Sequence, residues 1–428
     1  MKKAVITGIG VISPNGLGKE NFKTALLNGT SGIKAIQSFD ASKLDCQIAG
    51  EIHLNGNGFS KREQRNLPRV IQLALCASEE ALQDAGIDPP KLSKEERYRF
   101  GVLLGSGGGS IEFTERHYQM YYGSRKFEPS LYVISASTAG GLSSELSIRF
   151  GLLGQSHVIT TGCTSSTDAI GYGFREIQAG RLDYVLAGGA DAPIAEGILT
   201  GFSLMKILPT QWNQAPAKGS RPFSKDRSGF VLSEGSWMFI LEEKEHALAR
   251  GAKIYAEITG YGSSCEAFHA VSLDENGEGN LRAVHLAAGE AGVWPEEIDY
   301  VNLHGTSTLL NDRVETRAMK NFFGRKVMQV PMSSTKSMIG HPQGASGAAG
   351  LAATLLCMDE DKIHPTINLT EPDPECDLDY VPDTARQTKI RHALCNTLGF
   401  GSKCSALMIK NPYLTPPPLR GRKEEGEV

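Results

Sequence analysis

One cysteine in the stretch VITTGCTSSTDAIG, residues 158–171, has the surroundings of a nucleophile. The run SHVIT before it is β-branched and apolar, which predicts a short buried strand. Hydroxyl residues that favour helix starts follow Cys163 directly. Ile170, Phe174 and Ile177 then recur at the spacing of one helix face. Cys163 is therefore expected on a strand-to-helix turn.

A thiol at a helix N-terminus lies beside unpaired N–H groups and the positive end of the helix dipole. Both favour an anion, so the pKa of Cys163 is predicted to be lowered toward the reactive thiolate. Gly162 before it permits the tight backbone found at the nucleophiles of other acyl-transfer enzymes. A free cysteine is also a compact buried hydrophobe. The local residues leave both interpretations open.

Two histidines and a lysine follow in glycine- and hydroxyl-rich segments. His304 lies in NLHGTSTLLND, and Lys336 and His341 lie in SSTKSMIGHPQGASGAAG. Such loops let the backbone approach a ligand closely, and a cysteine nucleophile needs partners that can be distant in sequence. Each histidine could equally be a loop residue bonded to backbone, and Lys336 a solvated surface lysine.

Composition excludes several classes of protein. The chain has 428 residues with a net charge of −4, which gives no reason to expect a nucleic-acid partner. Its eight cysteines form no CxxC pair, which argues against a disulfide scaffold or metal site and favours the reducing cytoplasm. No apolar stretch approaches the ~20 residues of a membrane span.

Strand-like and helix-like runs alternate along the chain, which predicts an α/β fold. ITGIG at 6–10 recurs as ITGYG at 258–262, and each opens such an alternation. Two similar halves, divided near residue 255, are therefore expected. GSGGGS at 105–110 lacks the lysine of a phosphate-binding loop and is interpreted as a strand-ending turn. The proline-rich, then charged, tail at 413–428 predicts an extended or disordered end.

Taken together, the sequence resembles the β-ketoacyl-acyl-carrier-protein synthases, condensing enzymes with the thiolase fold, over about residues 3–410. TGCTSS resembles their nucleophile loop, LHGTSTLLND their first histidine loop, and SSTKSMIGHPQGASG their lysine and second histidine loop. The resemblance implies two duplicated α/β halves in an α-β-α-β-α arrangement. Residues 1–255 would carry the nucleophile and residues 256–412 the two histidines.

The resemblance also implies a reaction. Cys163 would take an acyl chain from a carrier protein, and His304 and His341 would assist decarboxylation of malonyl-carrier protein by hydrogen-bonding the developing enolate. The resulting carbanion would attack the acyl-cysteine. The backbone N–H groups of Cys163 and Phe400 would form the oxyanion hole, and Phe400 would be the gate beside the nucleophile.

Supporting roles follow from the same resemblance. Lys336 would orient the loop of His341 through hydrogen bonds with Glu315, and Thr306 and Thr308 would hold the phosphopantetheine arm of the carrier protein. No metal and no permanently bound cofactor are expected.

The segments TGCTSSTDAIGYG and GGADAPI look closer to the alpha ketosynthases of type II polyketide systems than to housekeeping fatty-acid elongation synthases. The polyketide branch implies pairing with a related chain-length factor that lacks the cysteine, whereas a homodimer is the alternative. The loop GFGSKCSA departs from the family at Lys403 and Cys404, which leaves the shape of the acyl entrance open. A non-catalytic partner subunit and a thiolase-like enzyme using Cys404 are the other function classes.

A basic cluster could receive the carrier protein. SKREQRNLPRVIQ places four cations close together: Lys61, Arg62, Arg65 and Arg69. Three of them share one helix face if a helix starts early, whereas Pro68 could instead split the cluster. Because carrier proteins of these systems are acidic, the resemblance implies docking here. A solvated face is the alternative.

Overall fold

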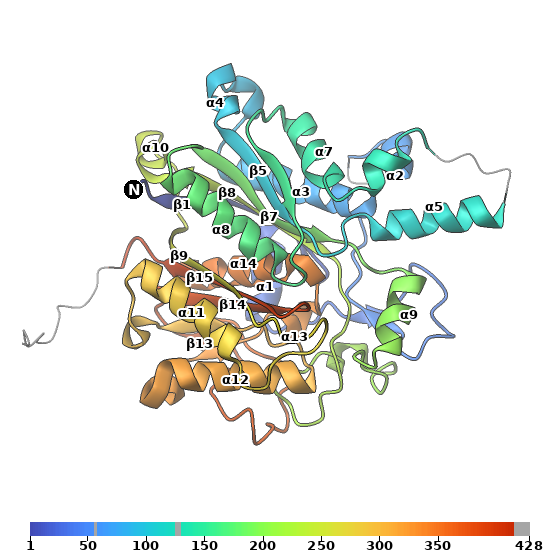
Figure 1. Cartoon of the computed structure of the whole chain (residues 1–428), viewed down its shortest axis with the longest axis vertical. Coiled ribbons are helices and arrows are strands. Elements are labelled where there is room, and N and C mark those ends of the chain that lie inside the picture. The colour runs from blue at the N-terminus through green and yellow to red at the C-terminus, as the bar shows by residue number, and fades with distance from the viewer. Residues whose placement is uncertain (55–57, 125–129, 415–428) are drawn as a thin grey trace, which may run out of the picture.

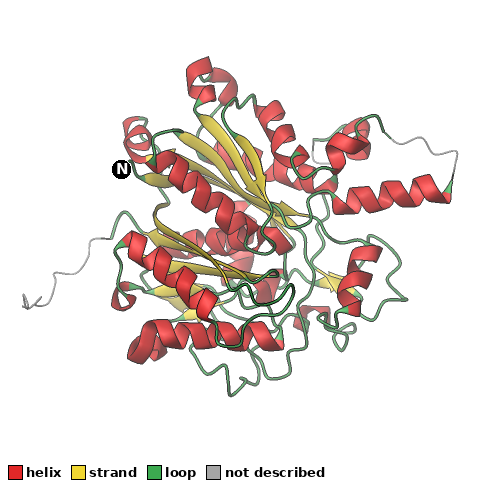
Figure 2. Cartoon of the chain, in the orientation of Figure 1, coloured by secondary structure: helices red, strands yellow, loops and turns green. Residues whose placement is uncertain are grey.

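The computed structural model describes residues 1–54, 58–124 and 130–414, shown in Figures 1 and 2. Most of the predicted tail, residues 415–428, lies outside this range. Within these ranges no helix is long and apolar enough to cross a membrane.

The strands form two five-stranded sets with the same order and the same directions. The first set runs β1 (Ala4–Ser13), β8 (Gly235–Glu243), β7 (Tyr184–Asp191), β5 (Phe100–Gly105) and β6 (Ser156–Ile159). The second runs β9 (Ala256–Cys265), β15 (Lys403–Lys410), β14 (His392–Gly399), β10 (Tyr300–Asn302) and β11 (Met332–Ser333). In each set the first two pairings are antiparallel and the last two parallel.

The sets join through antiparallel pairing of β1 with β9, and β2 (Gly16–Leu17) adds to β1. Division of the chain at 255/256 stays a prediction, because the sheet continues across it. Two small ribbons lie apart: β3 (Lys34–Ala35) with β4 (Ile48–Ala49), and β12 (Lys362–Ile363) with β13 (Arg386–Gln387).

Helices cover both sets and fill the space between them (Figure 1). α3 (Arg69–Asp84) and α7 (Gly141–Phe150) pack on the first set, and α11 (Glu278–Ala291) packs on the second, with α12 (Leu309–Phe323) against α11. α8 (Ser165–Gln178) and α14 (Ser346–Asp359) lie between the sets and contact each other. The side chains of α14 are buried on every face from Ser346 to Met358, as a central helix requires. The predicted α-β-α-β-α fold is thus confirmed.

The remaining helices are shorter or peripheral. They are α1 (Lys19–Leu27), α2 (Lys61–Asn66), α4 (Lys94–Tyr98), α5 (Ile111–Gly123), α6 (Val133–Ser137), α9 (Glu196–Leu204), α10 (Lys244–Ala249) and α13 (Lys336–Ile339). In Figure 1, α5 projects from the body of the molecule.

The repeated ITGIG and ITGYG motifs have the same packing role. A Cβ on Gly8 would lie 2.2 Å from the carbonyl oxygen of Ala81 in α3. A Cβ on Gly260, the equivalent glycine of the second motif, would lie 2.1 Å from the carbonyl oxygen of Ala287 in α11. Only glycine lets each outer helix lie this close to the first strand of its set. The motif therefore recurs because the same close packing recurs.

Candidate active site

Cys163 lies in the turn between β6 and α8, as predicted. Gly162 has φ +68°, and Thr164 is the residue before the first turn of α8. The helix buries Ile170 and Phe174 on one face, as their spacing predicts. The strand before the turn is only half-buried, in contrast to the prediction. β6 is an edge strand that pairs with β5 alone among the described strands, so one side of it is open.

The prediction of a lowered pKa at Cys163 is wrong for the free protein. Burial raises the pKa of the thiol to about 11. The charge of Lys336 and the backbone N–H groups of Phe400 and Cys163 lower it, but by less. A thiol that is 6% exposed has lost the water that would stabilise its anion. The group at rest is therefore a neutral thiol, and it needs a base.

His341 is in place to be that base, because its Nε2 lies 3.2 Å from Cys163 Sγ. The residue follows α13 and Gly340, which has φ +75°, and its backbone N–H donates to the carbonyl of Val231 at 2.7 Å. The ring packs edge-on against Phe230, and Ser346 Oγ lies 2.9 Å from Nδ1. Burial and the charge of Lys336 lower the pKa of His341 well below 6.5, so the ring is neutral and free to accept a proton.

His304 completes a cluster of three. It follows β10, and its ring centroid lies 5.4 Å from that of His341. Its Nδ1 is buried and has no hydrogen-bond partner in the described part of the chain. Burial lowers its pKa well below 6.5 as well. One donor atom from each of Cys163, His304 and His341 lies within 4.8 Å of the others, so these are also the residues through which a metal such as Zn²⁺ would bind.

Glu315 on α12 fixes the backbone of the His304 loop. Its carboxylate accepts the N–H groups of His304 and Gly305 at 2.7 and 2.8 Å, and the side-chain amide of Asn396 at 2.7 Å. Among the described residues no hydrogen bond joins Lys336 to Glu315, but the charge of Glu315 acts on Lys336 and raises its pKa against the effect of burial. The role of Lys336 in orienting the His341 loop stays a prediction.

Lys336 is not a surface lysine. It is 5% exposed at the start of α13, where its carbonyl accepts a hydrogen bond from Ser220 Oγ at 2.6 Å. Burial lowers the pKa of its ammonium group. When charged, this group acts on the site at a distance, since it lowers the pKa of Cys163 and of both histidines.

Phe400 follows β14 and approaches the nucleophile through its backbone. A Cβ on Gly399 would lie 3.0 Å from the backbone nitrogen of Cys163, so the two chains pass in close contact. The backbone N–H groups of Phe400 and Cys163 both lower the pKa of the Cys163 thiol. These are the two donors expected to form the oxyanion hole, and that role stays a prediction.

Cys163, His304 and His341 line one pocket of about 250 Å³. Thr306 and Thr308 line it, with their hydroxyls 2.9 Å apart. The other lining residues are Ile207, Phe230, Val271, Ser272, Leu273, Leu310, Asn311, Gln343, Leu398, Gly399 and Phe400. Most of the surface is apolar, which suits an acyl chain.

Asp191, at the end of β7, is a supporting residue that sequence reasoning missed. Its buried carboxylate accepts the hydroxyl of Ser106 and the backbone N–H groups of Gly107, Gly108 and Gly344. It therefore fastens the GSGGGS turn to the loop after His341. Because these N–H groups are occupied, the turn is not a phosphate-binding loop. The only sequence signal for a supporting role of Asp191 was its position at the end of a predicted strand.

Cys404 does not belong to the site. It is buried in β15, does not line the pocket, and its Sγ lies 3.8 Å from Glu266 Oε1. Burial raises its pKa. The thiolase-like alternative with Cys404 as a second catalytic cysteine is therefore not supported by the geometry. Lys403 begins β15 and pairs with Cys265 of β9.

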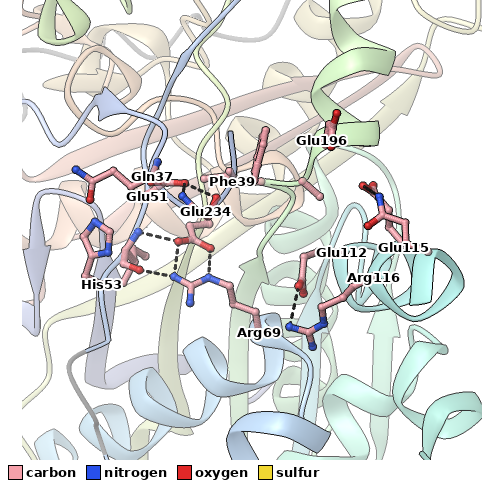
Figure 3. Close-up of a pocket in the computed structure, with 15 residues that line it drawn as sticks. Gln37, Phe39, Glu51, His53, Arg69, Glu112, Glu115, Arg116, Glu196 and Glu234 are labelled. Carbon is pink, nitrogen blue, oxygen red and sulfur yellow. Dashed lines mark hydrogen bonds and ion pairs between the residues drawn. The ribbon is translucent and has the colours of Figure 1, made fainter. Parts of the chain in front are cut away.

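The predicted docking cluster is divided. α2 ends at Asn66, and Pro68 precedes α3, so the cluster is split rather than aligned on one helix face. Its first three cations are exposed: Lys61, Arg62 and Arg65. Arg69 is different, because its guanidinium binds both carboxylate oxygens of Glu234, at 2.5 and 2.6 Å, and also the carbonyl of Ile52 (Figure 3). This pairing inside the protein argues against docking of a carrier protein by Arg69, and the docking role of the cluster stays a prediction.

Comparisons with known proteins agree with this geometry. The profile of the β-ketoacyl synthase N-terminal domain matches residues 1–247, and that of the C-terminal domain matches residues 255–370. The chain is 39% identical to a 3-oxoacyl-[acyl-carrier-protein] synthase 2 of Synechocystis sp., over 96% of this chain and 98% of the relative. It is also 39% identical to the tetracenomycin polyketide synthase ketoacyl synthase alpha subunit of Streptomyces glaucescens, over 97% and 98%.

A solved structure agrees as well. It holds a type II polyketide synthase acyl-carrier protein in complex with its ketosynthase bound to the hexaketide. The chain superposes on it with a TM-score of 0.88 at 30% identity, covering 96% of this chain and 99% of that one. The profiles, the relatives and the fold lead to one conclusion: the chain belongs to the β-ketoacyl synthase family of condensing acyltransferases.

Proposed function

We propose that this protein carries an acyl chain on Cys163 and condenses it with malonyl-carrier protein to give a 3-oxoacyl chain two carbons longer. The observation that carries the proposal is the contact of Cys163 Sγ with His341 Nε2 at 3.2 Å, in one pocket with His304. An intact cysteine paired with a base also argues against the role of a non-catalytic partner subunit.

Acylation comes first. Cys163 Sγ attacks the thioester carbonyl carbon of acyl-carrier protein while its proton passes to His341 Nε2. The oxyanion forms between the N–H groups of Cys163 and Phe400. The bond to the pantetheine sulfur then breaks, and this sulfur leaves with the proton from His341. Ser346 Oγ, which can donate or accept, supports His341 Nδ1 in either tautomer.

Condensation follows in the same pocket. The bond between the malonyl α-carbon and its carboxylate breaks, carbon dioxide leaves, and the electron pair forms an enolate. Neutral imidazoles of His304 and His341 donate to its oxygen, which is where the charge develops. The α-carbon forms a bond to the acyl carbonyl carbon, the bond from that carbon to Cys163 Sγ breaks, and the released thiolate takes up a proton from water. Thr306 and Thr308 hold the phosphopantetheine arm.

The acyl groups arrive on the phosphopantetheine of an acyl-carrier protein, which the exposed Lys61, Arg62 and Arg65 attract. No permanently bound cofactor is part of the proposal. We place the reaction in the cytoplasm and in type II polyketide synthesis, because of the segments TGCTSSTDAIGYG and GGADAPI. In that setting the chain pairs with a chain-length-factor-like subunit.

Fatty-acid elongation is the second candidate. The Synechocystis synthase and the polyketide alpha subunit are equally similar to this chain, at 39% identity each. In a fatty-acid pathway the protein would act as a homodimer. Purification from the native host separates the two, since a heterodimer with a cysteine-free homologue supports the polyketide role and a homodimer supports elongation.

The reaction itself is tested with purified components. The protein is incubated with octanoyl-carrier protein and malonyl-carrier protein, and the carrier protein is analysed by mass spectrometry. The proposal predicts 3-oxodecanoyl-carrier protein and release of one carbon dioxide per product. Recovery of both substrates unchanged under conditions that preserve the fold would contradict it.

A further inference from the structure

We infer that Gln343 makes this pocket selective for acyl chains that carry oxygen, such as the keto groups of a growing polyketide, over saturated chains of the same length. The inference rests on the proposed function, since it concerns the acyl group that Cys163 accepts. It starts from one side chain of the pocket whose polar atoms are not used by the protein.

The amide of Gln343 makes no hydrogen bond with any residue that the structure describes. The side chain lines the pocket of Cys163, and its Nε2 is buried without a partner. Only His304 Nδ1 shares this condition among the described lining residues. The neighbouring pocket amide, Asn311, differs because it donates to Asp312 at 3.2 Å. Gln343 thus lines the pocket with a side chain whose N–H donor the described protein leaves unused.

The backbone holds this donor in place. The backbone of Gln343 has φ +46°, a conformation that residues other than glycine rarely adopt. Gly344 after it donates to Asp191 at 2.7 Å, and a Cβ at Gly344 would lie 2.2 Å from the backbone nitrogen of Gly107. His341 is two residues before it and contacts the nucleophile. Strained backbone kept at such a place is typical of a functional position.

The energetics decide between two kinds of acyl chain. Water does not reach the amide nitrogen in the free protein, so this donor is already unpaired before any acyl chain enters. A keto oxygen within its reach supplies the missing hydrogen bond, whereas a methylene leaves the donor buried and unpaired. A site with an unpaired polar group discriminates far more strongly than an apolar pocket does. One unsatisfied donor corresponds to roughly a ten-fold loss or more.

Repeated condensation without reduction leaves a keto oxygen on every second carbon, because each cycle adds two carbons and one carbonyl. A chain of this kind presents oxygens at regular intervals along the pocket. One of them can therefore meet Gln343 as the chain grows, which a fatty acyl chain cannot do. The residue would favour polyketide intermediates whatever their total length.

The test uses three N-acetylcysteamine thioesters of one chain length: octanoyl, 3-oxooctanoyl and 5-oxooctanoyl. The rate at which each acylates Cys163 is followed by mass spectrometry in the wild type, Gln343→Met and Gln343→Leu. Methionine keeps the unbranched length of glutamine and removes the donor. Gln83→Met is the matched control, because Gln83 is exposed on α3 and its replacement should change nothing.

The wild type should prefer at least one oxo-thioester over octanoyl, and both Gln343 variants should reduce that preference about ten-fold. Comparing variant with wild type cancels the intrinsic reactivity of each thioester. Equal preference in wild type and both variants would overturn the inference while leaving the proposed function intact. If no thioester acylates the wild type, the proposed function fails, and the inference with it. Melting temperatures show that the variants are folded.

Discussion

Replacing Arg69 should lower the stability of the protein and should not weaken its binding of the carrier protein. Its guanidinium is one-third exposed, whereas the Glu234 carboxylate that it binds is 2% exposed. Arg69→Met leaves that carboxylate buried without its cation, and breaking a buried pair in this way costs about 3–5 kcal/mol. Water reaches part of Arg69, so we expect a loss of about 2–4 kcal/mol in the free energy of unfolding.

Urea unfolding at 25 °C measures this loss. Arg65→Met is the matched control, because Arg65 is exposed and its removal should change stability by less than about 0.5 kcal/mol. Adding Glu234→Gln to Arg69→Met should recover part of the loss, since no carboxylate is then left unpaired while the oxygen can still accept from Ile52 N–H.

Substitutions of the two arginines should also differ in their effect on the KM for acyl-carrier protein. Arg65→Glu should raise the KM for acyl-carrier protein and weaken its salt dependence, with little effect on a small acyl-thioester. Arg69→Met should raise that KM no more than it affects the small substrate. Unchanged stability of Arg69→Met, together with a selective rise in the KM for carrier protein, would refute this reasoning and restore Arg69 to the docking surface.

Three further predictions concern the pocket itself. Cys163→Ala should abolish condensation and cost only ~1 kcal/mol of stability, checked by product formation and urea unfolding; residual condensation would end its role as nucleophile. His304→Ala and His341→Ala should each slow malonyl decarboxylation by about 100-fold or more in a single-turnover assay, and an unchanged rate removes that histidine from the role. Alkylation of Cys163 by iodoacetamide should rise about ten-fold per pH unit from pH 7 to 10, because the thiol pKa of about 11 keeps the thiolate fraction small below it. Lys336→Met should slow alkylation at pH 7 and have little effect at pH 10, because the lysine charge lowers the thiol pKa and the pKa of Lys336 is itself lowered to about 8. A rate independent of pH would show a thiolate already formed at neutral pH.

Much of the fold could be predicted from local patterns. The spacing of Ile170, Phe174 and Ile177 fixed one face of α8, and all three are buried. The repeated glycine motif indicated two similar halves because each copy meets an outer helix. Such signals lie within a few residues of one another, so sequence alone carries them.

What the sequence could not show depends on contacts between distant segments. Arg69 and Glu234 are 165 positions apart, so a buried ion pair looked like one more surface cation. The raised pKa of Cys163 reflects burial by the whole fold, which outweighs its place at a helix N-terminus. Gln343 lay within a quoted motif, yet its unused amide appears only when every possible partner is placed around it.

The chemical state of Cys163 after exposure to acyl-carrier protein tests the central claim most directly. Wild-type protein and Cys163→Ala are incubated with octanoyl-carrier protein, without malonyl-carrier protein, and digested for mass spectrometry. We predict an octanoyl thioester on the peptide that contains Cys163, with release of free carrier protein, and no adduct in the variant. An unmodified Cys163 peptide, or an octanoyl group on another residue in both proteins, would contradict the account.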